Sequence, residues 1–257
     1  MSEIPLAEQL TLAVKTFERP KSLQRLLKSI RHFYPNLPVV VADDSRRARP
    51  IEGVNYLRLP HDVGLSAGRN ALVESTETPY FLLLEDDFEF TEETKLEMLL
   101  SGAEEHGFDI TAGDCVSHRR RGLRLHKWNE QICAKMHFQG DHLRLERSHH
   151  RKVGDFYLCD MVTNFFVAKT DTVRRVGGWD PILKIQEHEE FFVRLKKNQV
   201  SIAYCPQVLI NHWHDRNWNY RRFRRRSLMH LGMHKHGFRW FTDLGGTTRD
   251  FRTKEAA

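Results

Sequence analysis

Three adjacent carboxylates, Glu85, Asp86 and Asp87, follow the apolar segment Phe81–Leu84. Negative charges this close together repel one another, which is costly unless a cation lies among them. Hard divalent cations such as Mg²⁺ and Mn²⁺ take oxygen ligands, usually one or two carboxylates together with substrate phosphates. A solvated acidic turn is the alternative. The apolar segment before the acids, and further acids expected at the same edge of the fold, favour a cation site.

Two histidines, His212 and His214, lie at the end of the last strand-like segment, in the run VLINHWHD. A single histidine after a strand is more often packed or solvated than bound to a metal. If this strand reaches the same edge as the three acids, an imidazole there can complete a carboxylate–phosphate metal site. The sequence favours His212 over His214 for this role.

Four titratable residues, Glu187, His188, Glu189 and Glu190, open an amphipathic helix expected over residues 187–198. The positive end of the helix dipole stabilises negative charge there, so capping accounts for at least one of the acids. A general base must also be a carboxylate or an imidazole that faces the site. Spacing places Glu187 and Glu190 on one face of the helix, but it does not choose among the four residues.

The run GLSAGRN, residues 64–70, is a weak candidate for a phosphate cradle. It lacks the GK[ST] of a P-loop and does not have the GxGxxG pattern. Its Arg69 can pair with an anionic group, or the run is simply a turn that enters a helix.

A basic and aromatic stretch follows the last strand. Residues 216–242 hold eight Lys and Arg and no acid. Five aromatic residues interleaved with them are Trp218, Tyr220, Phe223, Phe238 and Trp240. Such a composition is typical of nucleic-acid-binding surfaces, but no RNP, helix-turn-helix or zinc-finger signature accompanies it. An anionic acceptor or an acidic membrane surface would suit it equally, whereas a plain solvated face would leave five aromatic side chains exposed.

The elements that must position these residues alternate along the first half of the chain. Apolar runs predict strands at residues 10–17, 37–45, 54–60 and 80–90, and helical spacing predicts helices at 18–34 and 64–75. This order predicts an α/β fold with a mostly parallel sheet flanked by helices. Three of the strands end in polar clusters, at residues 15–16, 43–45 and 85–87. Because ligands gather at the carboxyl ends of parallel strands, we expect these clusters to converge on one edge.

The second half is less regular. A helix is expected over residues 92–107, a buried strand over 163–168 and a last strand over 201–215. Between them, residues 117–152 hold ten Lys and Arg against three Asp and Glu with little periodicity. We expect that stretch to form loops and short edge strands over the sheet.

Composition bounds the class of protein. The chain has 257 residues, a formal net charge of +6, 40% hydrophobic and 29% charged residues, as in an ordinary globular protein of one large or two small domains. Disorder, collagen and coiled coil are poor explanations, and no apolar run reaches the ~18–20 residues of a membrane helix. The four cysteines form no CxxC pair, which argues against a zinc ribbon or a dithiol redox site. Buried free thiols are favoured, with one or two disulfides open if the chain is secreted.

Several segments, taken in order, resemble the GT-A nucleotide-sugar glycosyltransferases of family 2, and in particular the β-1,4-N-acetylgalactosaminyltransferases. The resembling runs are LAVKTFERPKSLQRLLKSIRHFYP, VVVADDS, GLSAGRN, FLLLEDDFEFTEETKLE, DMVTNFFVAKTDTVRRVGGWDP, HEEFF and LINH. The resemblance implies a single GT-A, Rossmann-like domain over residues 1–257 with a small antiparallel portion on the acceptor side. Its expected parts are a nucleotide-sugar half (1–115), an acceptor-side half (116–215) and the basic-aromatic segment (216–257).

The resemblance also implies roles for individual residues. Those expected around the donor are Thr16, Arg19, Asp43, Asp44, Arg69 and Asp86. In the DxD-type motif the last acid usually binds the metal, so Asp87 and His212 are expected to hold Mn²⁺ or Mg²⁺. Asp160 and Asn164 match a stretch that borders the sugar and the acceptor.

The general base is expected at the start of the helix at 187–198. Related enzymes carry a Glu-Asp pair there with the Asp as base, and the matching pair in this chain is Glu187–His188. We favour His188, because an imidazole titrates near neutral pH. Glu189 and Glu190 are the alternatives, and Glu190 is the second catalytic candidate.

The resulting hypothesis is an inverting, metal-dependent transfer of a sugar, with GalNAc the first choice, from a UDP-sugar to a glycan or lipid-linked acceptor. A sugar nucleotidyltransferase is disfavoured, because the run VKTFERP lacks a glycine-rich phosphate loop. Two further hypotheses stay open: a nucleic-acid-binding module and an inactive sugar-nucleotide-binding relative. The N-terminal run does not have the layout of a signal peptide. We therefore expect a cytoplasmic protein, peripheral to a membrane at most, or a Golgi protein whose anchor lies outside this chain.

Overall fold

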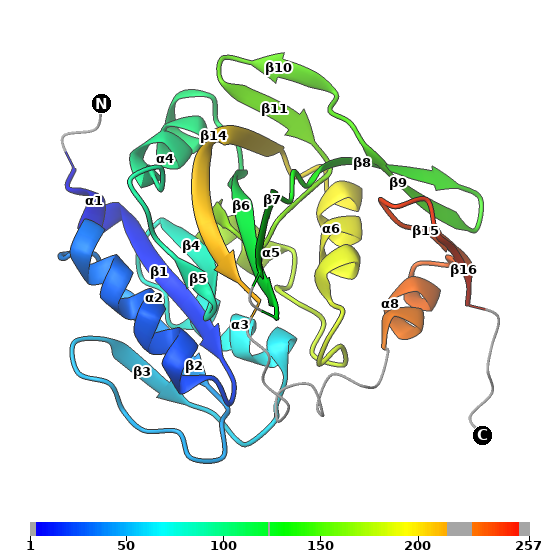
Figure 1. Ribbon diagram of the computed structural model, residues 1–257. Helices are drawn as coiled ribbons and strands as arrows, with labels where there is room; N and C mark the ends of the chain where they lie inside the picture. The colour runs from blue at the N-terminus through cyan, green and yellow to red at the C-terminus, as the bar shows by residue number, and fades with distance from the viewer. Residues whose placement is uncertain (1–3, 123, 215–227, 252–257) are drawn as a thin grey trace.

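The computed structural model describes residues 4–122, 124–214 and 228–251 (Figure 1). The helices are α1 (Leu6–Gln9), α2 (Pro20–Phe33), α3 (Leu65–Glu74), α4 (Leu96–Glu105), α5 (Thr170–Arg175), α6 (His188–Lys197) and α8 (Met229–Lys235). The strands of the first half are β1 (Leu10–Thr16), β2 (Val39–Asp43), β3 (Asn55–Arg58), β4 (Tyr80–Glu85), β5 (Phe88–Glu89) and β6 (Ile110–Arg121). Those that follow are β7 (Arg124–Asn129), β8 (Cys133–Gln139), β9 (His142–Arg147), β10 (Arg151–Val153), β11 (Phe156–Cys159), β12 (Met161–Val162), β13 (Phe166–Lys169), β14 (Ile202–Trp213), β15 (Trp240–Thr242) and β16 (Thr248–Asp250). Within the described ranges, no helix combines the length and apolarity needed to cross a membrane.

The large sheet has the strand order β10-β11-β14-β6-β13-β4-β1-β2-β3. Its first-half strands β4, β1, β2 and β3 are parallel neighbours, as the alternation of strands and helices predicts. Strands β1 and β2 are buried along their whole length, which explains their continuous apolar runs. The predicted α/β fold is therefore confirmed, and the parallel part is the part that carries the acids.

Helices cover both faces of this sheet (Figure 1). Helices α2 and α4 pack on one face, against side chains such as Leu12 and Val14 of β1. Helices α3, α5 and α6 pack on the other face, where Ala13 points. Successive side chains of a strand point to opposite faces, so one short apolar run contributes to both cores.

The basic stretch at residues 117–152 contains the expected short edge strands, β7 and β10, but its first residues belong to a long strand inside the sheet. Strand β6 is twelve residues long and lies inside the sheet between β13 and β14, and it continues into a hairpin with β7. Strand β7 is exposed along its whole length. Charged side chains on both faces of a solvated hairpin remove the apolar alternation on which strand prediction depends.

The second half of the sheet is mixed. Strand β13 is antiparallel to both β4 and β6, and β14 is parallel to β6. A second sheet has the order β12-β8-β9-β15-β16, and it lies at the side of the molecule away from β3 (Figure 1). These strands form the antiparallel portion that the resemblance implies.

The described part of the basic-aromatic segment contributes to the core. Phe238 and Phe241 are buried, and β15 pairs with β9 in parallel. Phe238 is therefore not available for a nucleic-acid-binding or membrane-binding surface of the kind that the composition suggests. Trp218, Tyr220 and Phe223 lie outside the described residues. All four cysteines are free thiols, and Cys115, Cys159 and Cys205 are buried.

Candidate active site

The two aspartates after β4 lie in a buried turn at the carboxyl edge of the parallel strands. Asp86 and Asp87 are both buried, and Arg19, which precedes α2, makes an ion pair with each of them. Thr16, at the end of β1, donates its hydroxyl hydrogen to Asp86 Oδ2 at 2.7 Å. The polar ends of β1 and β4 therefore converge as predicted, because the two strands are parallel neighbours.

Adjacent carboxylates in this turn have different electrostatic environments. Burial raises the pKa of Asp86 to about 6, although Arg19 opposes this shift. Burial would also raise the pKa of Asp87, but Arg19 and His212 outweigh it and hold that pKa below its usual range. Asp87 is thus the carboxylate of the pair that stays negative across the physiological pH range.

His212 reaches this turn because β14 pairs with the short strand β5. The pairing places His212 opposite Phe88, and the backbone N–H of Trp213 donates to the Asp87 carbonyl oxygen at 2.9 Å. His212 Nε2 lies 3.6 Å from Asp87 Oδ1. The predicted meeting of the late histidine with the acids is therefore present in the structure.

A divalent cation fits the atoms gathered here. Asp87 Oδ2 is occupied by Arg19, whereas Asp87 Oδ1 is buried and has no hydrogen-bond partner in the described chain. Ligand atoms of Glu85, Asp87 and His212 all lie within 4.8 Å of one another. Carboxylate oxygens with an imidazole nitrogen form a donor set that suits Mn²⁺ and also admits Mg²⁺. In the structure the positively charged His212 ring, 3.6 Å from Asp87 Oδ1, balances this buried carboxylate oxygen, and a bound divalent cation would take over that role.

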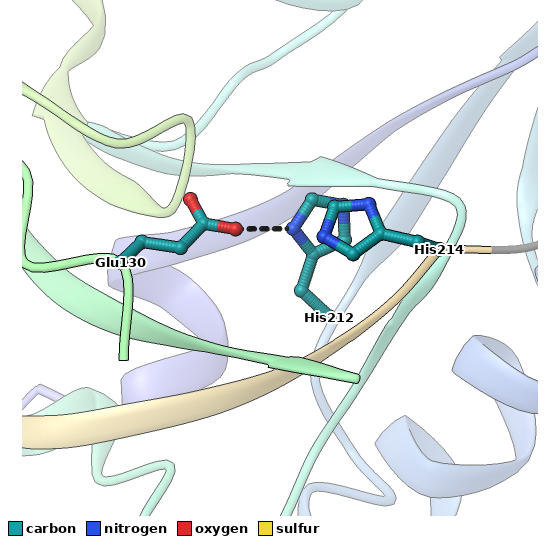
Figure 2. Close-up of side chains that lie close together, drawn as sticks. All are labelled: Glu130, His212 and His214. Carbon is teal, nitrogen blue, oxygen red and sulfur yellow. Dashed lines mark hydrogen bonds and ion pairs between the residues drawn. The ribbon is translucent and has the colours of Figure 1, made fainter. Parts of the chain in front are cut away.

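Glu130, which the sequence pattern did not single out, contacts the other side of His212. Its Oε1 atom lies 2.7 Å from His212 Nδ1 (Figure 2). Burial would lower the pKa of His212, but Asp87 and Glu130 on its two sides raise it to about 10. The sequence held one weak signal for Glu130: it is one of the three acids in the basic stretch at residues 117–152.

A cavity of about 170 Å³ lies beside the metal-binding candidates, and Glu85, Asn164, His188 and His212 are among the residues that line it. Asn164 donates its side-chain N–H to Glu85 Oε1 at 2.8 Å. The Asn164 oxygen therefore accepts a hydrogen bond from His188 Nδ1, also at 2.8 Å. The cavity brings together three residues assigned separately to metal, sugar and base.

At the start of α6, burial shifts the pKa values of His188 and Glu189 in opposite directions. Burial lowers the pKa of His188 to about 4, and burial raises the pKa of Glu189 to about 7. Glu187 makes an ion pair with Arg69, whose guanidinium also lies 3.4 Å from Glu85. Arg69 is therefore held by two carboxylates at the wall of the site.

Two sequence-based assignments are not supported by the structure. Glu190 makes a two-point ion pair with Arg194, at 2.8 and 3.1 Å, and a contact with His236 at 3.1 Å. Arg194 and His236 engage the Glu190 carboxylate on the side of α6 away from the cavity, so Glu190 is not placed to act as a base. The spacing of four residues between Glu190 and Arg194 is a sequence signal that anticipates such a pair.

Asp160 likewise has a structural role. It accepts hydrogen bonds from Lys196 Nζ at 2.6 Å and from the Met136 N–H at 2.8 Å, and it lies 3.0 Å from His150 Nε2. Lys196 is near the last residue of α6, and a ten-residue helix is about 15 Å long at 1.5 Å per residue. Asp160 is therefore bonded to the last turn of this helix, whereas His188 is the first residue of the helix.

The two acids at the end of β2, Asp43 and Asp44, have different surroundings. Asp44 is 1% exposed, with one oxygen paired to Lys15 and the other accepting the Gly64 N–H at 3.0 Å. Both oxygens thus have partners inside the protein, and the expected contact of Asp44 with the nucleotide stays a prediction. Asp43 bonds Tyr56 but lines, with Thr16, a groove of about 1550 Å³ beside α2.

Comparisons with known proteins identify relatives of this chain. The chain is 35% identical over 207 residues to beta-1,4 N-acetylgalactosaminyltransferase 2 of Mus musculus, a match that covers 79% of this chain and 39% of the relative. It is 36% identical over 207 residues to beta-1,4 N-acetylgalactosaminyltransferase 1 of Homo sapiens, covering 79% of this chain and 38% of the relative. The chain thus spans about two fifths of the length of these relatives.

Solved structures share the fold. S. aureus TarS 1-349 in complex with UDP-GlcNAc matches with a TM-score of 0.63 and 13% identity, over 87% of this chain and 64% of that one. GalNAc-T7 with UDP, GalNAc and Mn²⁺ matches with a TM-score of 0.61 and 14% identity, over 81% of this chain and 44% of that one. Identities this low show the fold alone, and that fold is GT-A.

The family model of the glycosyl transferase family 2 matches residues 11–162. This stretch runs from β1, through the acidic turn, to the strands that precede Asn164. Because the match covers more than half of its residues, the chain belongs to glycosyl transferase family 2.

Proposed function

We propose that this chain transfers a sugar from a UDP-sugar to a hydroxyl group of a glycan or lipid-linked acceptor, with inversion at the anomeric carbon. The observation that carries the proposal is the cluster of Glu85, Asp87 and His212 at the edge of a parallel sheet, whose ligand atoms all lie within 4.8 Å of one another. The relatives are named as N-acetylgalactosaminyltransferases, which supports GalNAc as the sugar. One structure of the same fold was solved with UDP and Mn²⁺, which supports the donor and the metal.

In this proposal Asp87 and His212 hold Mn²⁺ or Mg²⁺, with Glu85 beside them. The bound cation offsets the negative charge that develops on the departing diphosphate. Arg19 keeps Asp87 ionised and fixes the direction of its carboxylate. Thr16 and Asp43, at the groove beside α2, are placed to contact the nucleoside.

His188 is the proposed general base. Its Nδ1 donates to the Asn164 oxygen, so the neutral ring carries its lone pair on Nε2. Burial lowers its pKa to about 4, below the near-neutral value for which the sequence favoured it, so the imidazole is neutral at pH 7 and in this proposal accepts the proton of the acceptor hydroxyl. The hydroxyl oxygen then attacks the anomeric carbon from the face opposite the diphosphate. No covalent sugar–enzyme intermediate is needed.

The first experiment measures UDP release from a panel of UDP-sugars with Mn²⁺ and glycan acceptors. We expect release to be greatest with UDP-GalNAc and to stop when the metal is chelated. Asp87→Asn keeps the shape of the side chain but removes its charge, and it should lower turnover at least ~100-fold. Asp171→Asn is the matched control, because that side chain is 94% exposed on α5.

Turnover by Asp87→Asn at the parent rate would refute the metal assignment. Binding of UDP-sugars without UDP release from any of them would identify an inactive sugar-nucleotide-binding relative instead. Steeply salt-dependent binding to DNA or RNA, with no UDP-sugar hydrolysis, would favour the nucleic-acid-binding hypothesis.

A further inference from the structure

His212 has a carboxylate on each side of its ring. Its Nε2 faces Asp87 Oδ1 at 3.6 Å, and its Nδ1 lies 2.7 Å from Glu130 Oε1. A histidine that binds a metal through one nitrogen usually donates the N–H of the other nitrogen to a carboxylate or carbonyl. The Glu130 contact with Nδ1 has the geometry of that second bond (Figure 2).

Glu130 is itself held in place from several directions. Its backbone N–H donates to the Cys115 carbonyl oxygen at 2.9 Å, and Arg147 donates to its carbonyl oxygen at 2.8 Å. Ser117 donates its hydroxyl hydrogen to Glu130 Oε1. Because that hydrogen is used, the Ser117 oxygen accepts the N–H of His214 Nε2 at 2.8 Å. The carboxylate therefore reaches His212 from a fixed position.

We propose that Glu130 is a positioning residue that fixes the tautomer and the orientation of His212 for metal binding. The inference rests on the proposed function, because it assumes that the His212 Nε2 atom binds the donor's divalent cation. A carboxylate at Nδ1 keeps the hydrogen on that nitrogen, so that Nε2, the nitrogen that faces Asp87, is the one that would give up its proton and bind the cation. It also makes the imidazole a stronger electron donor to the cation.

The alternative is that Glu130 only fastens the end of β7 to β14. Strand β6 already joins these strands, since it pairs with β7 and with β14, including Ser117 opposite both Trp128 and His212. The strands thus have their own hydrogen-bond ladders on both sides of β6. A side chain that served only the fold would be redundant here, so its loss should affect the metal far more than the stability.

The test is calorimetric titration of Mn²⁺ into the full chain saturated with UDP. Glu130→Ala should weaken Mn²⁺ binding about 10- to 100-fold, the usual effect of losing such a partner. Glu130→Gln keeps an acceptor oxygen but has no charge. Its affinity for Mn²⁺ should lie between those of Glu130→Ala and the parent. Glu105→Gln, at an exposed position of α4, should bind as the parent does.

A second readout reports the tautomer directly. In ¹⁵N-histidine-labelled protein with Mg²⁺ and UDP, the His212 nitrogens should show hydrogen on Nδ1 in the parent and a mixture of tautomers in Glu130→Ala. Parent-like Mn²⁺ affinity and an unchanged tautomer in a folded Glu130→Ala would overturn the role of Glu130 alone. Failure of the parent chain to bind Mn²⁺ with UDP would overturn the proposed function itself.

Discussion

Single carboxylates in this chain differ in function because their partners differ. Asp86 and Asp87 are neighbours, yet one has a pKa raised to about 6 by burial and the other a pKa held below its usual range. Asp44 is buried at the end of β2 but has both oxygens bonded. Of these three, Asp87 combines a stable charge with an oxygen that has no hydrogen-bond partner within the described ranges. That combination, not acidity alone, distinguishes a metal ligand.

The pH dependence of transfer distinguishes the two candidate bases. A base must be deprotonated to act, so kcat/KM should fall about tenfold per pH unit once the pH drops below the pKa of the base. With His188 as base, we expect kcat/KM to stay level from neutral pH down to about 4. A fall that begins near pH 7 would instead identify Glu189, whose pKa burial raises to about 7.

Burial, rather than the charged groups around it, gives His188 its low pKa. Glu187 and Glu85 raise the pKa of His188 and Arg69 lowers it, but burial is the largest contribution and lowers it. The measurement is the initial rate at limiting UDP-sugar between about pH 4 and pH 9, a range that spans both pKa values, with circular dichroism at each pH to verify that the chain stays folded. His188→Gln should lose the acid limb of the profile together with most of the rate.

Close packing of α3 against β1 sets the position of the acidic ends of the strands. At Gly68 an added Cβ would overlap the Cδ and Cε atoms of Lys15. The Lys15 ammonium group is buried and paired with Asp44 at the ends of β1 and β2. The second glycine of the run GLSAG, which was a weak candidate for a phosphate cradle, thus lets α3 pack closely against β1. Gly64 behaves similarly, since a Cβ there would lie 2.7 Å from the Lys184 Cα atom.

Gly68→Ala should therefore destabilise the protein even though alanine favours helices. Displacing Lys15 disturbs its pair with Asp44, and overpacking of this kind costs about 1–3 kcal/mol, which exceeds the helix-propensity gain of about 1 kcal/mol. Glu74→Ala, at the exposed end of α3, should change the free energy of unfolding by less than about 0.5 kcal/mol. Urea unfolding measures both. Equal or higher stability of Gly68→Ala would show that Lys15 moves aside freely.

At the scale of the whole molecule, the described C-terminal residues complete the core on the face of the large sheet that α6 covers. Helix α8 packs close to α6, where a Cβ at Gly232 would lie 3.1 Å from Glu190 Cγ. Strand β15 extends the second sheet beside β9, with Phe241 opposite Leu143. The helix that bears His188 is thus supported from its outer side by residues that come much later in the chain.

Phe241→Ala should accordingly be costly. The side chain is 1% exposed, and truncating a buried phenylalanine typically costs about 3–5 kcal/mol. Leu231→Ala on α8 is the control, because Leu231 is 37% exposed and its truncation should cost about 0.5 kcal/mol or less. The comparison uses the urea midpoint at constant slope. Equal midpoints for the two variants would mean that β15 is not part of the cooperative core.

The sequence by itself determined the parallel strands and the edge at which their polar ends meet, because apolar runs and strand polarity are local properties. It also identified Asp87, His212, Asn164 and His188 as neighbours of one site, through the order of motifs. What it could not determine was which charged groups are already paired. Glu130, Asp160 and the buried part of the C-terminal segment take their roles from partners distant in the chain. The tertiary structure alone decided those pairings, since a carboxylate's chemistry depends on the atoms that packing brings to each of its oxygens.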